Sequence, residues 1–234
     1  MFAAFLHSGY GSDTMVADHA GHKGELLLIQ FAKSPVPGQV KTRMLPVLNA
    51  EQACALHQEL LEWTCHSLCN AGLGEVELWV SGNSEHQTFK RCLNQGVSCI
   101  ALQCGEDLGA RMCHALADGL ARYQCVILVG SDCPAISPHY LSGAVRALAS
   151  NSVVLGPADD GGYVLVGMTQ LCCEMFEGIE WGQNTVWADT VKILEGLSIN
   201  WEGLASLPDI DRPEDLSIWH AIQRLPKERA LKPV

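Results

Sequence analysis

Basic and acidic side chains gather in a few segments of this sequence, and their types suit the binding of phosphates and divalent cations. The segment 32–46, AKSPVPGQVKTRMLP, carries Lys33, Lys41 and Arg43 and no acidic residue, although the chain has 26 acidic against 15 basic side chains. Cationic side chains neutralise phosphate charge, and Gly38 would let the backbone approach phosphate oxygens. Taken alone, the segment is explained equally well as a solvated loop.

Two other segments place carboxylates where they could hold Mg²⁺ or Mn²⁺. In VILVGSDCP an apolar run leads straight to Asp132, and in LPDIDRPEDL the residues Asp209 and Asp211 alternate. Carboxylate oxygens suit these cations, and residues two apart on an extended stretch face the same way. Helix capping is the competing interpretation, because Asp132 could cap a following helix and Asp211 has Glu214 at the capping-box spacing.

A pair of adjacent carboxylates, Asp159 and Asp160, precedes Gly161, Gly162 and Tyr163 in the segment GPADDGGYVL. A tight turn between two strands explains this sequence without any function. The same residues could bind the hydroxyl groups of an acceptor, and a carboxylate among them could deprotonate one. Both interpretations stay open.

Alternating strands and helices would bring these segments to one edge of a sheet. Ligands of open α/β sheets bind at the carboxyl ends of the strands, where the polar segments fall. We therefore predict an α/β fold with a mostly parallel sheet and helices on both faces. In GEDLGARM, Asp107 is explained better as a helix cap than as a contact to ribose or base. Strands are predicted at 26–32, 75–80, 97–102, 125–131, 152–157 and 162–168, and helices at 51–71, 107–123, 138–149, 171–177, 184–196 and from about Pro213.

Composition predicts one cytoplasmic domain. Residues 1–24 lack periodicity and are expected to form a mobile tail, followed by a domain at 25–222 and a second tail at 223–234. A net charge of −11 disfavours nucleic acid as a partner. No apolar run approaches the roughly 20 residues that span a bilayer, and the start of the chain does not resemble a signal peptide. The 11 cysteines include no C-x-x-C pair and are expected to be reduced, serving as small hydrophobic residues.

The motifs AKSPVPGQVKTR, GEDLGARM, GSDCP, GPADDGGY and DIDRPED, in this order, resemble the bacterial arsenosugar-biosynthesis-type glycosyltransferase family. That family belongs to the nucleotide-diphospho-sugar transferase superfamily, with a Rossmann-like glycosyltransferase A fold, and is similar to 2-phospholactate guanylyltransferase and molybdenum cofactor guanylyltransferase. The resemblance covers about 26–220. It implies that Lys41 and Arg43 contact a diphosphate, that Asp132 and Asp211 bind the metal, and that the DDGGY segment faces the acceptor. Lys33, Gly38 and Asp107 carry over as further nucleotide-binding candidates.

Two hallmarks of related enzymes are missing. The D-x-D motif of glycosyltransferases would need a carboxylate two positions from Asp132, where Gly130 and Pro134 stand, and the G-x-G-x-R loop of nucleotidyltransferases has no glycine in AKSP. The first expectation is a glycosyltransferase in which Mg²⁺ or Mn²⁺, Lys41 and Arg43 stabilise the departing nucleoside diphosphate while Asp160 orients or deprotonates a small-molecule acceptor.

Two alternatives remain. One is a nucleotidyltransferase that joins a nucleoside triphosphate to a phosphorylated small molecule and releases pyrophosphate, stabilised by the same cations. The other is a nucleotide-binding protein without catalysis, because a fold and a site do not prove turnover. The oligomeric state also stays open, with a homodimer among the alternatives.

Overall fold

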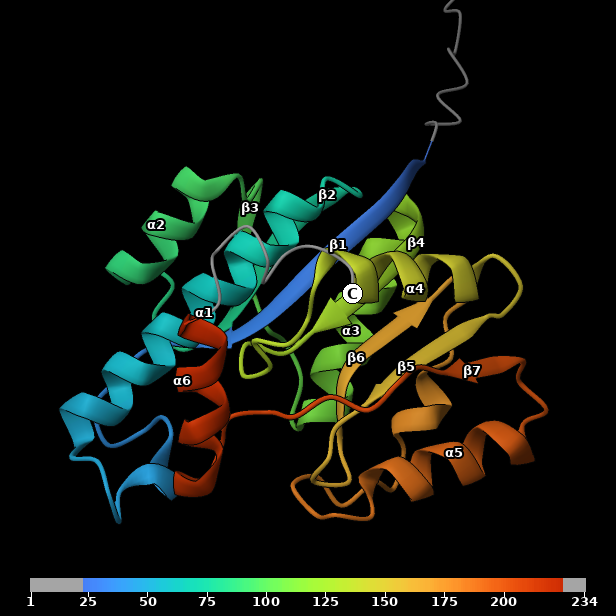
Figure 1. Cartoon of the computed structure of the whole chain (residues 1–234). Helices are drawn as coiled ribbons and strands as arrows, with labels where there is room; N and C mark the ends of the chain where they lie inside the picture. The colour runs from blue at the N-terminus through green and yellow to red at the C-terminus, as the bar shows by residue number, and fades with distance from the viewer. Residues whose placement is uncertain (1–22, 225–234) are drawn as a thin grey trace, which may run out of the picture.

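The computed structural model describes residues 23–224, which are built around a seven-stranded sheet (Figure 1). The strand order is β3-β2-β1-β4-β6-β5-β7, and within this part of the chain only β6 runs antiparallel to its neighbours. This mostly parallel sheet with its helices confirms the predicted fold class. The strands are β1 (Gly24–Lys33), β2 (Glu75–Ser81), β3 (Cys99–Leu102), β4 (Tyr123–Val129), β5 (Val153–Pro157), β6 (Tyr163–Met168) and β7 (Trp201–Gly203).

The central strands are buried on both faces, which explains why their sequences are continuous apolar runs rather than alternating ones. In β1 every residue from Leu26 to Ala32 is buried, and the last four residues of β4 are buried as well. A short turn joins β5 to β6, since antiparallel strands need no helical crossover. Gly130, just after β4, donates its N–H to the carbonyl of Val164, so this turn lies at the same sheet edge as the end of β4.

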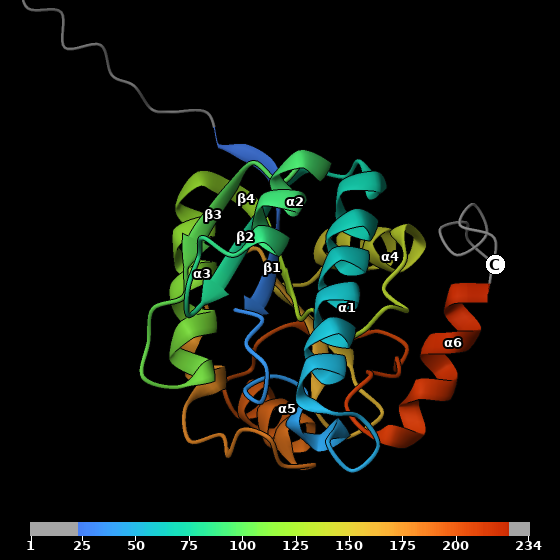
Figure 2. The same ribbon diagram turned by 90° about the vertical axis from the view of Figure 1, so that its left-hand side faces the viewer.

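Helices cover both faces of the sheet (Figures 1 and 2). On one face α1, α2 and α4 share a core that includes Leu61, Phe89 and Leu141, and on the other α3 and α5 pack around Leu116 and Leu194. The last helix, α6, packs against the first half of α1. The helices are α1 (Ala50–Ala71), α2 (Gln87–Gln95), α3 (Leu108–Arg122), α4 (Pro138–Leu148), α5 (Val186–Gly196) and α6 (Leu216–Arg224), with 3₁₀ turns η1 (Thr42–Met44), η2 (Cys173–Phe176) and η3 (Pro213–Asp215).

The structure differs from the prediction at a few elements. Sequence analysis did not anticipate α2, whose polar sequence buries only Thr88, Phe89 and Cys92, or β7, which has three residues and is too short to show a period. The helix predicted at 171–177 is only the 3₁₀ turn η2. Of the predicted tails, residues 1–22 and 225–234 lie outside the described residues, and α6 continues to Arg224.

One pair of cysteines overturns the expectation that all are reduced. Cys113 of α3 and Cys173 of η2 are joined by a disulfide, with their Cα atoms 5.3 Å apart. The two are 60 residues apart in the sequence, so periodicity could not reveal that their elements pack together. The other nine cysteines are free, and most are buried or half-buried among apolar side chains.

None of the helices described between Lys23 and Arg224 combines the length and the apolar character needed to cross a bilayer.

Candidate functional site

The polar segments singled out in the sequence meet at the carboxyl ends of β1 and β4. Ile210 donates its N–H to the carbonyl of Asp132 at 2.9 Å, and Asp159 donates its N–H to the carbonyl of Leu207 at 3.2 Å. The side chain of Lys41 donates to the carbonyl of Ile210. The stretch 207–211 therefore connects the loops that follow β1, β4 and β5. The carboxyl ends of the strands are where the sequence predicts that these loops meet.

Lys41 is a buried cation between two carboxylates. Its Nζ lies 2.8 Å from Oδ1 of Asp132 and 3.9 Å from Oδ1 of Asp211, and its side chain is only 2% exposed. The backbone of Lys41 is left-handed, with a φ of 48°, a conformation that costs free energy in a residue other than glycine. The ion pairs and the bond to Ile210 offset this cost. In this arrangement Lys41 serves as an internal counterion rather than as a cation facing solvent.

Arg43 is the exposed cation beside this pair. Its Nη1 lies 2.5 Å from Oδ2 of Asp211, and its side chain is 49% exposed. The hydrogen bond to Asp211 raises the pKa of Arg43 above its usual value. Lys33, also exposed, donates to the carbonyl of Gln39 at 2.8 Å. Arg43 and Lys33 are thus the side chains of this loop that an incoming phosphate could reach directly.

The capping interpretation is wrong for both candidate metal ligands. Helix α4 is capped by Ser137 and not by Asp132, whose side chain is 45% exposed. Beyond Asp211, the carboxylate of Asp215 accepts from the N–H groups of Asp211 and Arg212. The side chains of Asp132 and Asp211 are therefore not used to begin helices, and their carboxylates are held at the sheet edge by Lys41 and Arg43.

The site carries more negative than positive charge. Burial, together with the nearby carboxylates of Asp160 and Asp211, raises the pKa of Asp209 to about 6. Four carboxylates thus lie close to two cations, Lys41 and Arg43. The carboxylates are those of Asp132, Asp160, Asp209 and Asp211. This excess would favour a bound cation.

A divalent cation fits this donor set in a limited way. Across residues 23–224 no three His, Cys, Asp or Glu side chains are arranged to hold a metal ion on their own. However, Mg²⁺ is commonly held by one or two carboxylates together with substrate phosphates and water. Asp132, which is half exposed, and Asp211 meet that lesser requirement.

Sequence analysis missed His57, which the structure places behind Asp132. This α1 residue is buried, with Nε2 2.9 Å from the carbonyl of Lys33 and Nδ1 3.9 Å from Oδ1 of Asp132. Burial lowers the pKa of His57 below its usual value. A histidine inside an amphipathic helix gives no signal in the sequence, because its position matches the apolar stripe.

The DDGGY segment forms the predicted turn between β5 and β6. Asp160 accepts a hydrogen bond from the N–H of Gly162 at 2.9 Å, and Asp159 accepts one from the hydroxyl of Ser206. Gly161 has a φ of 92°, and a Cβ there would lie 2.2 Å from the carbonyl oxygen of Asn184, so only glycine fits. The turn leaves Asp160 exposed beside Arg43, which is also compatible with an acceptor-binding role.

A cavity of about 200 Å³ opens next to this turn. Arg43 and Asp160 lie on it, and Phe31, Met112 and Trp181 contribute apolar surface. Tyr163 follows Gly162 into the lining, and burial raises the pKa of its hydroxyl above the usual value. The cavity therefore joins the charged cluster to an apolar interior.

The remaining candidates lie at the margin of this site. Asp107 caps α3, because its Oδ1 accepts from the N–H of Ala110 at 2.7 Å, which confirms the capping interpretation. The next residue, Leu108, lines the cavity. Gly38 has a φ of 77°, a backbone conformation that favours glycine, and no atom lies within 4 Å of its Cβ position.

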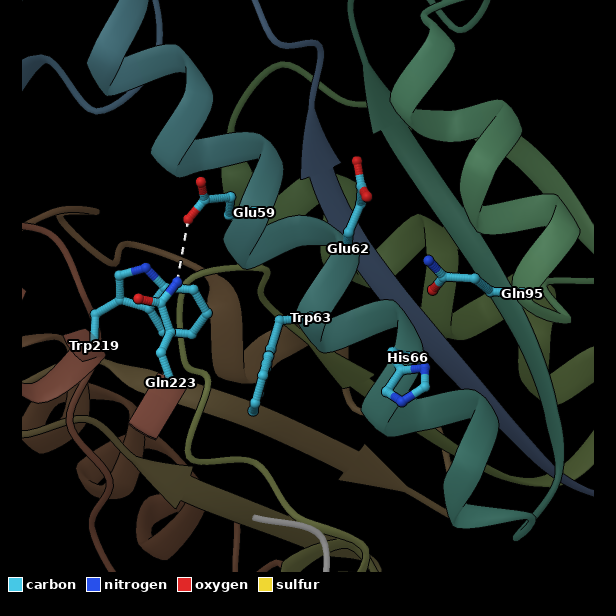
Figure 3. Close-up of a pocket in the computed structure, with 7 residues that line it drawn as sticks. All are labelled: Glu59, Glu62, Trp63, His66, Gln95, Trp219 and Gln223. Atoms are coloured by element: carbon cyan, nitrogen blue, oxygen red, sulfur yellow. Dashed lines mark hydrogen bonds between the residues drawn. The ribbon is translucent and has the colours of Figure 1, made fainter. Parts of the chain in front are cut away.

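A larger hollow, of about 450 Å³, lies on the outer face of α1 between α6 and the end of α2 (Figure 3). Its two carboxylates already have partners: Glu62 accepts from Arg91, and Glu59 accepts from Gln223 at 3.4 Å. None of the side chains predicted from the sequence to act in the site lines this hollow. The candidate site is therefore the cluster at the sheet edge.

The fold is that of the nucleotide-diphospho-sugar transferases. The chain belongs to the family described as "Uncharacterized protein conserved in bacteria (DUF2064)", whose model matches residues 64–183, about half of the chain. This span includes Asp132 and the DDGGY turn but not Lys41, Arg43 or Asp211. A search of curated protein sequences found no match.

Solved structures share this fold. A protein from Desulfovibrio desulfuricans G20, described as a "putative nucleotide-diphospho-sugar transferase", shares 29% identity with a TM-score of 0.78, over 88% of this chain and 90% of the other. CMP:2-keto-3-deoxy-manno-octonic acid synthetase in complex with CTP has 11% identity and a TM-score of 0.54, over 86% and 98%. Rv0371c of Mycobacterium tuberculosis H37Rv in complex with manganese has 16% and 0.51, over 84% and 98%. The prediction of a transferase-type enzyme is confirmed; the last two matches show the fold alone.

Proposed function

We propose that the protein is a metal-dependent glycosyltransferase that uses a nucleotide-diphospho-sugar donor. The observation that carries the proposal is the cluster in which Lys41 bridges Asp132 and Asp211 while Arg43 stays exposed, at the carboxyl ends of β1 and β4. Clusters of cations and carboxylates at this edge suit a diphosphate with its cation. The similarity to the Desulfovibrio protein, by its description, favours a sugar donor.

Each side chain takes a role from its position. Arg43 and Lys33, the exposed cations, contact the diphosphate, with Gly38 allowing close approach of the backbone. The main role of Lys41 is to hold Asp132 and Asp211 in place. This role differs from the direct contact with the diphosphate that the family resemblance implies. Asp107, the cap of α3, stays a marginal candidate for nucleotide contact.

On the acceptor side, Asp160 orients or deprotonates a hydroxyl group. Its carboxylate is exposed at the turn, and Gly162 and Tyr163 line the cavity beside it. Asp159 and Gly161 belong to the same turn and complete the proposed acceptor-binding segment. A carboxylate within reach of the acceptor hydroxyl can serve as the general base. Asp160 takes this role because Asp159 is already paired with Ser206.

Asp132 and Asp211 would hold Mg²⁺ or Mn²⁺ together with the phosphates. When bound, such a cation neutralises charge that builds up on the departing nucleoside diphosphate. The manganese complex of a protein with the same fold supports this choice of cation.

A nucleotidyltransferase is the second candidate, because a protein of the same fold binds CTP. The same cluster would then stabilise departing pyrophosphate. We also propose that the protein belongs to the arsenosugar-biosynthesis-type family and that it acts in the cytoplasm. A homodimer is part of the same proposal.

A thermal-shift screen tests the proposal. Nucleotide sugars, nucleoside diphosphates and nucleoside triphosphates are each added with Mg²⁺, with Mn²⁺ or with EDTA, because a ligand that binds the native state raises the melting temperature. Stabilisation by a nucleotide sugar that requires the cation is expected. A preference for one triphosphate would instead favour the nucleotidyltransferase, and no shift with any nucleotide would contradict both.

A further inference from the structure

The cavity beside the DDGGY turn has two chemically different ends. Arg43 and Asp160 lie at its charged end, next to the cluster described above, whereas Phe31, Met112 and Val186 present apolar surface. The three apolar residues come from β1, α3 and α5, so helices on one face of the sheet enclose this end. A ligand that fills the cavity must therefore be polar at one end and apolar at the other.

The apolar end sets the size and the polarity of what can enter. The cavity measures about 200 Å³. An apolar cavity of roughly 150 Å³ holds one benzene ring, so this one accommodates a group of about that size. Beyond the charged end, the hydroxyl of Tyr163 and the indole N–H of Trp181 are buried without partners, and each could pair with one group of a ligand. Most hydroxyls of a sugar would lose their hydrogen bonds with water against these walls, which disfavours a sugar as the occupant.

We propose that this cavity binds the acceptor, and that the acceptor is a small alcohol carrying a flat or compact apolar group. The apolar group enters between Phe31, Met112 and Trp181, and the hydroxyl stays at Asp160. This assignment rests on the proposed function, because it makes Asp160 the residue that orients the acceptor hydroxyl. It goes further by specifying the chemical class of the acceptor.

The position of Asp160 favours the acceptor over the nucleotide as the occupant. Asp160 and Tyr163 both line the cavity and come from the DDGGY turn, whereas Arg43 alone represents the cationic loop there. Lys33 and Lys41 do not line it. A nucleotide diphosphate would then lie over the cluster at the sheet edge, with the acceptor beside it.

Gly130 offers a way to close the cavity without disturbing the fold. It lines the cavity just after β4, its φ is not positive, and a Cβ added there would meet no atom within 4 Å. A valine at this position would project into empty space. Gly143 of α4 provides a matched control, because an added Cβ meets only the end of Arg146 at 3.8 Å and α4 covers the opposite face of the sheet.

The test measures the binding of benzyl alcohol to the full chain by saturation-transfer NMR. Glycerol serves as the polar probe. Wild type and Gly143→Val should bind benzyl alcohol alike, whereas Gly130→Val should bind it about tenfold more weakly or not at all. Glycerol should show no comparable binding. Absence of benzyl alcohol binding in the wild type, equal binding by Gly130→Val, or equal binding of glycerol would each overturn the proposal. Unchanged melting temperatures of both variants confirm that the fold is intact.

A second readout separates the acceptor from the nucleotide. In the thermal-shift screen Gly130→Val should keep the full stabilisation by the nucleotide and its cation, because the nucleotide lies outside the cavity. Loss of that stabilisation would assign the cavity to the nucleotide and overturn the proposal. If no nucleotide stabilises the wild type but benzyl alcohol binds in a Gly130-dependent manner, the proposed transferase function fails while the cavity's preference for an apolar alcohol stands.

Discussion

Lys41 Nζ lies 2.8 Å from Asp132 Oδ1, and this pair joins the loop after β1 to the loop after β4. The lysine side chain is buried and the aspartate is half exposed. A cation in this position neutralises Asp132 and, at 3.9 Å, Asp211. Removal of the Lys41 ammonium group would take this cation away from both carboxylates. It would also leave the carbonyl of Ile210 without its hydrogen-bond donor.

Lys41→Met should therefore lower the free energy of unfolding by about 2 kcal/mol, less than the loss of one partner of a fully buried pair because Asp132 is partly solvated. Urea unfolding measures the difference. Lys33→Met is the matched control: the same substitution at an exposed lysine of the same loop should change the free energy of unfolding by less than about 0.5 kcal/mol. Equal effects of the two substitutions would contradict the role of Lys41 as an internal counterion.

Arg43→Ala should weaken nucleotide binding about tenfold while leaving stability nearly unchanged, because its half-exposed side chain adds little to the fold and carries an exposed positive charge. Isothermal titration with the nucleotide identified in the screen measures the affinity. Arg43→Lys keeps the charge and should recover part of the loss. An unchanged affinity in Arg43→Ala would refute the phosphate contact.

The sequence predicted the sheet and most helices because their apolar runs and periods are local. It also predicted that Lys41 and Asp132 share one site, since both follow strands whose carboxyl ends meet, and the family resemblance added Asp211 to that site. It could not predict that Lys41 is buried rather than exposed. That outcome depends on Ile210, which is distant in the sequence and supplies the carbonyl that orients the ammonium group.

His57 and the disulfide illustrate the same limit. The histidine lies on α1, and nothing in its own segment shows that the ring faces Asp132. The cysteine pair depends on the packing of α3 against η2, which is a tertiary contact. Local patterns indicate which elements form and which loops carry charge, whereas the partner of each buried polar group is fixed only when those elements pack.

An ion pair far from the site, in which the carboxylate is buried and the arginine is half exposed, should contribute to stability. Glu77 of β2 is almost fully buried, accepts from Arg122 of α3 at 2.7 Å and also accepts from the indole N–H of Trp79. Arg122→Met leaves that carboxylate buried without its counterion, and breaking such a pair costs about 3 kcal/mol. Urea unfolding should show this loss.

The double variant Arg122→Met/Glu77→Leu tests the cause of that loss. It removes the uncompensated charge, so it should be more stable than Arg122→Met alone. Glu77→Leu alone is measured as well. If the double variant loses as much free energy of unfolding as the two single variants together, packing and not charge accounts for the result.

Asp132→Asn should abolish the effect of Mg²⁺ or Mn²⁺ on nucleotide binding. The amide keeps the shape of the side chain and can still accept from Lys41 through its oxygen, but it loses the negative charge that a divalent cation requires. Melting temperatures measured with the nucleotide, with and without the cation, give the metal-dependent part of the shift. In Asp132→Asn that part should vanish, while the shift produced by the nucleotide in EDTA persists.

Glu202→Asn, on β7 away from the cluster, should keep both parts. A metal-dependent shift of full size in Asp132→Asn would exclude Asp132 as a ligand and leave the cation to other oxygens of the site.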